Sequence, residues 1–236
     1  QLFLAQEHLS RNQVKFSPAV NEDLGATAVW GTQQSNLRGD GLYDGVFAMW
    51  FAKGPGVDRS GDAIRHGNLA GTSPNGGVLL LLGDDHACES STTAHQSEYS
   101  LVNAMVPVLN PAGVQDILDY GLYGWSLSRY SGCWVGLKCV HDTVEASASV
   151  SVSVDRIQTE VPADFILPGG GVHIRWPDGF LEQEERLHRY KLEAVKAFAK
   201  ANPIDRQIMG DSDAHTGIVT TGKSYLDVRR ALLELN

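Results

Sequence analysis

Cysteine is scarce in this sequence of 236 residues, and its positions exclude several kinds of site. Cys88, Cys133 and Cys139 form no Cys-x-x-Cys pair and no spacing typical of a metal site. An iron–sulfur cluster normally takes four cysteine ligands, so this segment alone is not expected to hold one. Because free cysteines are usually buried, we expect three buried thiols in a reducing, cytoplasmic compartment.

Long apolar runs and an excess of basic residues are also missing. The longest unbroken aliphatic run is Val78 to Leu82, whereas a membrane helix needs about 20 apolar residues. Lysine and arginine number 19 against 28 aspartates and glutamates, which gives a net charge of −9. Such a chain would be repelled by nucleic acids and anionic membranes, so we expect neither as a partner.

Short apolar strands alternate with helical patterns over the first 150 residues. Strands are expected at 14–16, 45–51, 78–82, 106–109 and 134–140, and helices at 1–9, 21–34, 62–69 and 112–130. Continuous apolar strands that alternate with helices predict a three-layer α/β fold with a mostly parallel sheet. Ligands of such sheets bind at the carboxyl ends of the strands. The Gly-rich loop expected at 53–61 and the polar stretch at 83–98 both lie at such ends.

The pattern changes after residue 146. Period-two alternation at 147–155 predicts a half-exposed strand, and 181–201 has the pattern of an amphipathic helix. A strand at 217–221 and a helix from Ser224 have no partners within the chain, and they resemble the start of a second α/β domain. The predicted divisions are a first domain at 1–155, a linker and helix at 156–210, and a truncated second domain at 211–236.

Residues 217–224 match the pattern of a phosphate-binding P-loop, Gly-x-x-x-x-Gly-Lys-Ser. A working P-loop needs a strand before its first glycine, and the preceding residues DSDAHT do not favour one. The isoleucine, valine and threonines inside the match are themselves typical of a strand. We therefore predict no P-loop.

Asp84, Asp85 and His86 directly follow the strand expected at 78–82. Carboxylates and imidazoles at such a position could bind a divalent metal, as a metal-dependent hydrolase requires. Further candidate ligands in the sequence are His66, Glu89, His95 and Glu98. No recognised metal spacing is present, and the same residues also suit a polar loop of caps and hydrogen bonds. Both interpretations stay open on these residues alone.

Several long segments resemble the 2-oxoacid:ferredoxin oxidoreductases, and in particular the fused, long-chain indolepyruvate ferredoxin oxidoreductases of bacteria. The segments are VNEDLGATAVWGTQQ, YDGVFAMWFAKGPGVDRSGDAIRHGNLAGTS, GGVLLLLGDDHACESSTTAHQSE, PVLNPAGVQDILDYGLYGWSLSRYSG and KCVHDTVEASASV. They cover residues 20–150 almost without gaps, and IRWPD at 174–178 and GIVTTGKSYLDVR at 217–229 extend the similarity. In that family the matching part is the pyrimidine-binding domain for thiamine diphosphate, which here lacks its first strand.

The resemblance implies oxidative decarboxylation of aryl 2-oxoacids such as indolepyruvate to acyl-CoA and CO₂. Coenzyme A accepts the acyl group, and electrons pass through iron–sulfur clusters to ferredoxin. The clusters and the Mg²⁺ that holds the diphosphate belong to other domains of the parent chain, so no metal is expected in this segment. We expect a homo-oligomer and a fragment that is inactive alone. A domain of this family that has become a non-catalytic interaction module is the other alternative.

The resemblance also implies roles for individual residues. Glu22, by itself an ordinary first-turn carboxylate, matches the glutamate that activates the cofactor by hydrogen bonding its aminopyrimidine ring. Gly54, Pro55 and Gly56 match a turn beside the cofactor, where glycine permits close backbone approach. The stretch 84–98 resembles the loop at the active-site entrance. Its residues expected near substrate or cofactor are His86, Ser90, Ser91 and Gln96.

Overall fold

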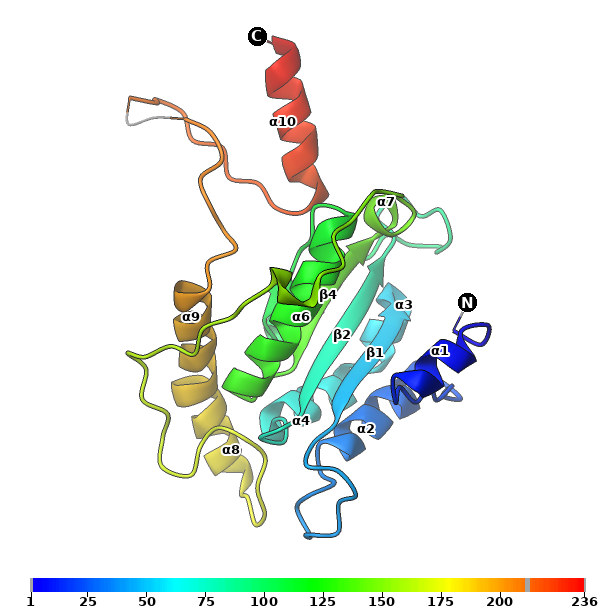
Figure 1. Ribbon diagram of the computed structural model, residues 1–236, viewed down its shortest axis with the longest axis vertical. Coiled ribbons are helices and arrows are strands. Elements are labelled where there is room, and N and C mark those ends of the chain that lie inside the picture. The colour runs from blue at the N-terminus through cyan, green and yellow to red at the C-terminus, as the bar shows by residue number, and fades with distance from the viewer. Residues whose placement is uncertain (1, 211–212, 236) are drawn as a thin grey trace.

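The computed structural model describes residues 2–210 and 213–235 and contains one four-stranded parallel sheet (Figure 1). The strands are β1 (Phe47–Lys53), β2 (Gly77–Asp84), β3 (Val108–Leu109) and β4 (Val135–Val140). Their order is β1-β2-β4-β3, and each adjacent pair is parallel. The register places Leu80 between Trp50 on β1 and Gly136 on β4. The predicted mostly parallel α/β fold is confirmed.

Helices cover both faces of this sheet. The first face packs against α2 (Glu22–Thr32), α3 (Gly54–Arg59), α4 (Gly61–Ala70) and α5 (Ser97–Asn103). The second face packs against α6 (Val114–Ser131) and α9 (Leu192–Ala201). Side chains of β2 alternate between the two faces, with Leu80 and Leu82 in the core of the first face and Leu79 in the core of the second. This burial on both sides is why β2 needs an unbroken aliphatic run.

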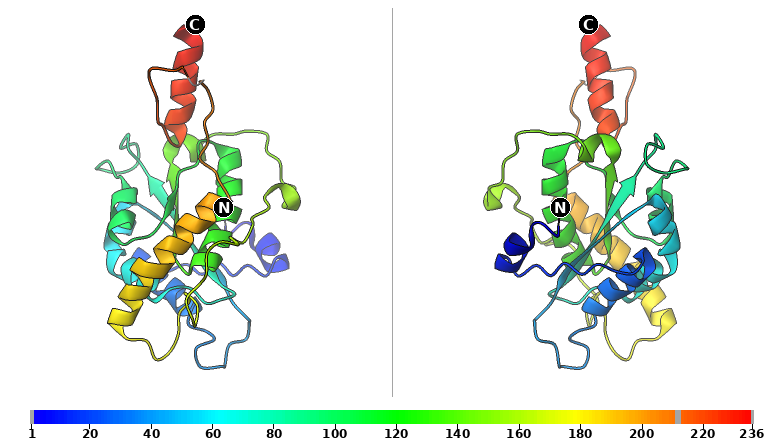
Figure 2. Two further views of the ribbon diagram at one scale, coloured as in Figure 1. Left: turned by 90° about the vertical axis from the view of Figure 1, so that its left-hand side faces the viewer. Right: turned by 90° about the vertical axis from the view of Figure 1, so that its right-hand side faces the viewer.

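The remaining elements lie around these layers. They are α1 (Gln6–Arg11), α7 (His141–Val144), a 3₁₀ turn η1 (Val154–Arg156), α8 (Phe180–Arg186), a π-helical turn η2 (Leu187–Lys191) and α10 (Lys223–Leu235). Figure 2 shows α10 rising from the end of the sheet toward which the strands run. None of the helices in the described part of the chain is both long and apolar enough to cross a membrane.

Local signals fix the ends of the main helices. The Asn21 side chain accepts a hydrogen bond from the Leu24 N–H at 2.8 Å, so Asn21 caps α2 as the sequence predicts. Helix α6 ends at Gly132, whose φ of +72° lies in the left-handed region that glycine adopts readily. The helix expected at 1–9 instead runs from Gln6 to Arg11, and residue 1 lies outside the described residues.

Three predicted strands are wrong, namely those at 14–16, 147–155 and 217–221. A strand persists only where a neighbour accepts its hydrogen bonds. The segment around Ser151 instead bonds a helix: the Gln115 side chain on α6 accepts from the Ser151 N–H at 2.8 Å and donates to its carbonyl at 3.2 Å. Alternating valine and serine therefore predicted the wrong local structure.

The helical segment predicted at 181–201 is confirmed, and it belongs to the second face of the sheet. Phe198 packs edge-on against Tyr123 of α6, with ring centroids 5.2 Å apart. The π-helical turn η2 also brings Lys191, fully buried, beneath the carboxyl end of α4. There its ammonium donates to the carbonyl oxygens of Asn68 and Leu69. Whether the chain divides into domains at 155 and 210 stays a prediction.

Two of the three cysteines meet expectation. Cys133 and Cys139 are buried free thiols, and burial raises the pKa of Cys139 to about 11. Cys88, however, is exposed, so the prediction of three buried thiols is wrong for this residue. It lies in the polar loop after β2 with a φ of +57°, away from the packed layers.

Candidate functional site

Glu22 lies where the first turn of α2 meets β1 and α3. The indole Nε1 of the buried Trp50 on β1 donates to the Glu22 carbonyl oxygen at 2.9 Å, which fixes the backbone of that turn. The carboxylate projects toward α3, where its Oε2 is 3.4 Å from Nη1 of Arg59. The Glu22 side chain remains 42% exposed. Glu22 is therefore held by its backbone while its carboxylate stays accessible.

The segment that carries Gly54, Pro55 and Gly56 forms helix α3, so the Gly-rich loop predicted at 53–61 is wrong. Proline in the first turn is favourable because its missing N–H is not needed there. A Cβ at Gly56 would lie 2.6 Å from Cγ of Glu22. A Cβ at Gly54 would lie 2.2 Å from Cγ of His95. Gly54 thus leaves room for the side chain of His95, and Gly56 leaves room for those of Glu22 and Ala52.

The loop between β2 and α5, residues 85–96, is named the polar loop below, and Asp85 organises its first half. The Asp85 carboxylate accepts hydrogen bonds from the backbone N–H groups of Glu89, Ser90 and Ser91 at 2.9, 2.6 and 3.0 Å. These donors, Ser90 first, hold the pKa of Asp85 below its usual value. The Asp85 carboxylate therefore stabilises the conformation of its own loop.

Four contacts fasten the polar loop to its surroundings. On the α7 side, His86 Nε2 is 3.5 Å from Asp142, and Glu89 is 2.9 Å from His141. On the α3 side, Lys53 Nζ donates to the Ser90 carbonyl at 2.7 Å and to its hydroxyl at 3.0 Å. The fourth contact joins His95 Nε2 to Asp58 Oδ2 at 3.1 Å. The loop therefore spans the carboxyl ends of the strands from α7 to α3.

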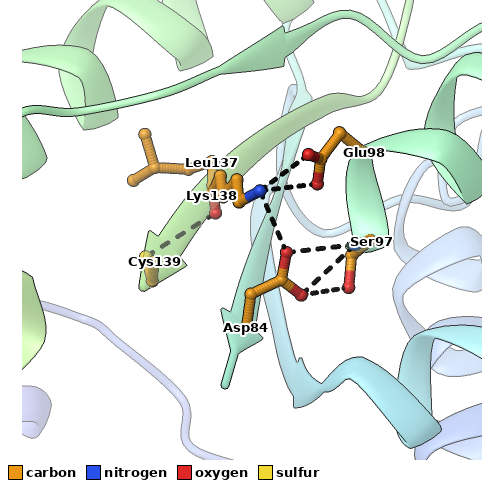
Figure 3. Close-up of polar contacts among 6 residues, drawn as sticks. All are labelled: Asp84, Ser97, Glu98, Leu137, Lys138 and Cys139. Carbon is orange, nitrogen blue, oxygen red and sulfur yellow. Dashed lines mark hydrogen bonds and ion pairs between the residues drawn. The ribbon is translucent and has the colours of Figure 1, made fainter. Parts of the chain in front are cut away.

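A buried charge network lies under the polar loop (Figure 3). Asp84, at the end of β2, has a fully buried side chain that accepts from the backbone N–H and the hydroxyl of Ser97. Lys138 on β4 approaches Asp84 at 3.5 Å and donates to both Glu98 oxygens at 2.7 Å. This network joins β2 and β4 to the start of α5, which fixes the far end of the polar loop.

All three residues first considered as metal ligands, which directly follow the aliphatic run of β2, have partners within the protein. Asp84 bonds Ser97 and Lys138, Asp85 bonds its own loop, and His86 pairs with Asp142. Within 2–210 and 213–235, no group of three or more histidine, cysteine, aspartate or glutamate side chains is arranged to hold a metal ion. The geometry does not favour a metal-dependent hydrolase.

The four residues expected near substrate occupy one edge of the molecule without forming a cluster of their own. His86, Ser90 and Gln96 are exposed, and Ser91 is partly exposed. The contacts of His86, Ser90 and Ser91 are with Asp142, Lys53 and Asp85. Sequence reasoning gave no role beside Glu22 to Arg59, Asp58 or His95. The signal that could have found them is the pair of glycines at 54 and 56, since each glycine predicts a close neighbour.

Comparison with known proteins supports the resemblance seen in the sequence. No family model matches the sequence. Three archaeal proteins named indolepyruvate oxidoreductase subunit IorA are similar to the chain. That of Pyrococcus abyssi is 26% identical over 196 residues, that of Archaeoglobus fulgidus 26% over 200, and that of Methanothermobacter thermautotrophicus 25% over 197. The chain is similar to these indolepyruvate oxidoreductase subunits.

The resemblance predicted from the sequence is thereby confirmed at the level of the family. The matches cover 80–81% of the chain but only 29–30% of each relative. The chain thus spans about three tenths of the length of the proteins it matches. Their names describe a subunit of an oxidoreductase, whereas a fused, long-chain parent stays a prediction for this sequence.

Proposed function

We propose that this chain supplies the pyrimidine-binding side of a thiamine diphosphate site in a 2-oxoacid oxidoreductase. The observation that carries the proposal is the placement of Glu22. Its carboxylate is accessible, its backbone is fixed by Trp50, and it fills the space that Gly56 leaves open. The family relationship and the parallel sheet, whose carboxyl ends carry α3 and the polar loop, support the same assignment.

The residues present suit an aminopyrimidine ring. A carboxyl group can hold a proton against a ring nitrogen, and the Glu22 oxygens have only Arg59 as a neighbour in the described contacts, at 3.4 Å. An aminopyrimidine nitrogen would share the carboxylate with that guanidinium. When bound, thiamine diphosphate supplies the nucleophilic carbon that attacks the keto group of a 2-oxoacid. Glu22 would position the ring and exchange a proton with it, while Gly54, Pro55 and Gly56 would border the cofactor.

The wider proposal follows the names of the relatives, which are indolepyruvate oxidoreductase subunits. We propose aryl 2-oxoacids such as indolepyruvate as substrates, coenzyme A as acyl acceptor and ferredoxin as electron acceptor. Iron–sulfur clusters and the Mg²⁺ of the diphosphate would be held by other parts of the whole protein, which we propose is a homo-oligomer. Near the substrate we place four residues of the polar loop and its end: His86, Ser90, Ser91 and Gln96.

The test is Glu22→Gln in the whole protein in which this sequence occurs. Anaerobic, coenzyme-A-dependent reduction of ferredoxin by indolepyruvate is followed with thiamine diphosphate and magnesium present. Loss of a proton-transferring carboxylate typically costs about 10²- to 10⁴-fold in rate, so we expect at least a tenfold fall in kcat. The matched control is Asp23→Asn, which removes the neighbouring first-turn carboxylate and should retain activity.

Two results would contradict this assignment. Undiminished activity of the Glu22→Gln variant would remove Glu22 from the reaction while leaving the family relationship intact. Absence of activity with every 2-oxoacid tried would favour a non-catalytic interaction module of the same family.

A further inference from the structure

Helix α3 is held from two sides by side chains that enter the spaces left by its two buried glycines. On one side Glu22 packs over Gly56, and its carboxylate faces Arg59 at 3.4 Å. On the other side the ring of His95 packs over Gly54. His95 Nε2 lies 3.1 Å from Oδ2 of Asp58, the residue next to Arg59. The two contacts thus meet on consecutive residues of one short helix.

We propose that His95 is a positioning residue for Glu22, acting through Asp58 and Arg59 of α3. The inference rests on the proposed role of Glu22, but the contacts that carry it are independent of any ligand. His95 belongs to the polar loop, so the proposal also makes the conformation of that loop one determinant of where the Glu22 carboxylate lies.

The surroundings of His95 favour this role over that of a surface residue. Its side chain is only 17% exposed, although it lies in a loop. Its Nδ1 faces the Thr93 carbonyl oxygen at 3.3 Å, and its Nε2 faces the Asp58 carboxylate. Both partners are hydrogen-bond acceptors, and each of them faces one of the two ring nitrogens. The ring therefore joins the polar loop backbone to α3 in a defined orientation.

The coupling to Glu22 follows from the size of α3. The helix comprises six residues, Gly54 to Arg59, and makes few hydrogen bonds of its own. Its position consequently depends on the side chains packed against it, and releasing Asp58 should also shift Arg59. A carboxylate that must meet a ring nitrogen is sensitive to such shifts, since misplacement by about 1 Å can cost about 10²-fold in rate.

The first experiment measures hydrogen exchange in the whole protein without cofactor. We expect His95→Gln to accelerate amide exchange in residues 54–59 about two- to tenfold, the effect typical of losing one hydrogen bond. Asp58→Ala removes the acceptor of the same contact, together with the 3.5 Å contact of the Ser100 hydroxyl, and should do the same without additivity in the double variant. The control is His141→Gln, which removes the Glu89 pair of the same loop on its α7 side.

We expect amide exchange at 54–59 to be faster in both contact variants and unchanged in the control. Unchanged exchange at 54–59 in Asp58→Ala, or an equal change in His141→Gln, would overturn the proposal. The second variant keeps the test decisive if His95→Gln proves unstable, because the Asp58 side chain is 60% exposed.

The second experiment asks whether His95 acts through Glu22. In the active whole protein, His95→Gln should lower kcat about tenfold and leave KM for the 2-oxoacid unchanged. In a Glu22→Gln background it should lower kcat no further. If the kcat losses of the two single variants multiply in the double variant, His95 acts independently of Glu22 and the proposed coupling is overturned. If Glu22→Gln alone has no effect, the proposed function fails, and the exchange experiment still decides the contact between His95 and α3.

Discussion

Lys191 is a fully buried ammonium, and its charge should determine how stability depends on pH. Burial lowers the pKa of Lys191 to about 8 from its usual 10.5. The only hydrogen-bond acceptors that its ammonium meets in the described part of the chain are the carbonyl oxygens of Asn68 and Leu69. We therefore expect Lys191 to make the folded state less stable at neutral pH than at alkaline pH.

The sign follows from the two pKa values. Between pH 8 and 10.5 the unfolded chain keeps the Lys191 proton and the folded chain releases it, so stability rises with pH. A difference of this size corresponds to about 3 kcal/mol, most of which is recovered between pH 7 and pH 10. The buried Cys139 thiol acts oppositely, because a raised pKa costs stability as the unfolded thiol ionises.

The assay compares urea unfolding of the wild type and Lys191→Met at pH 7 and pH 10. Taking the difference between the two proteins cancels the contribution of Cys139. We expect that difference to move by about 2–3 kcal/mol in favour of the wild type on going to pH 10. Lys196→Met is the control, because Lys196 is 71% exposed beside Glu193 and should show no such movement. A difference that does not change with pH would refute the reasoning.

The remaining predictions concern packing, the buried network and thiol access. Gly54→Ala would place a methyl carbon 2.2 Å from the imidazole of His95 and should lower the free energy of unfolding by about 1–3 kcal/mol. The control Gly31→Ala, whose added carbon would meet no atom within 4 Å, should not destabilise the protein. Equal melting temperatures of the two variants would contradict this prediction. Asp84→Asn should lower the free energy of unfolding by about 1–3 kcal/mol, because the N–H and hydroxyl of Ser97 lose a charged acceptor. An unchanged denaturation midpoint would argue against this prediction. In native protein a maleimide should label Cys88 alone among the three cysteines, as mass spectrometry can check, and native labelling of a second would show an open core.

The sheet could be predicted because its central strands β2 and β4 are buried on both faces. Continuous apolar runs such as Val78 to Leu82 and the apolar residues of β4 are unfavourable in water, so composition alone predicts that these segments are buried. The failed strands share one cause. Residues 147–155 and 217–221 are rich in β-branched residues, but β-propensity expresses fit to a neighbouring strand, and the described chain offers them none.

The candidate site was predictable only in part. Glu22 could be singled out through the resemblance, since a first-turn glutamate is ordinary in any helix. His95 and Arg59 could not, because their contacts join residues 37 positions apart in sequence. The helical conformation of α3 could not be predicted for the same reason. Glycine and proline favour a loop locally, and the side chains that pack against α3, those of Glu22 and His95, lie on other elements.

The sequence by itself determined which segments are buried, where helix α2 begins and helix α6 ends, and which family the chain resembles. These properties depend on local pattern: aliphatic runs, a capping Asn21, and a glycine free to adopt positive φ. The tertiary structure decided that α3 is a helix between Glu22 and His95, and that Lys191 lies buried beneath α4. Closure of the chain around the sheet brings these distant side chains together, and burial then sets their charge and position.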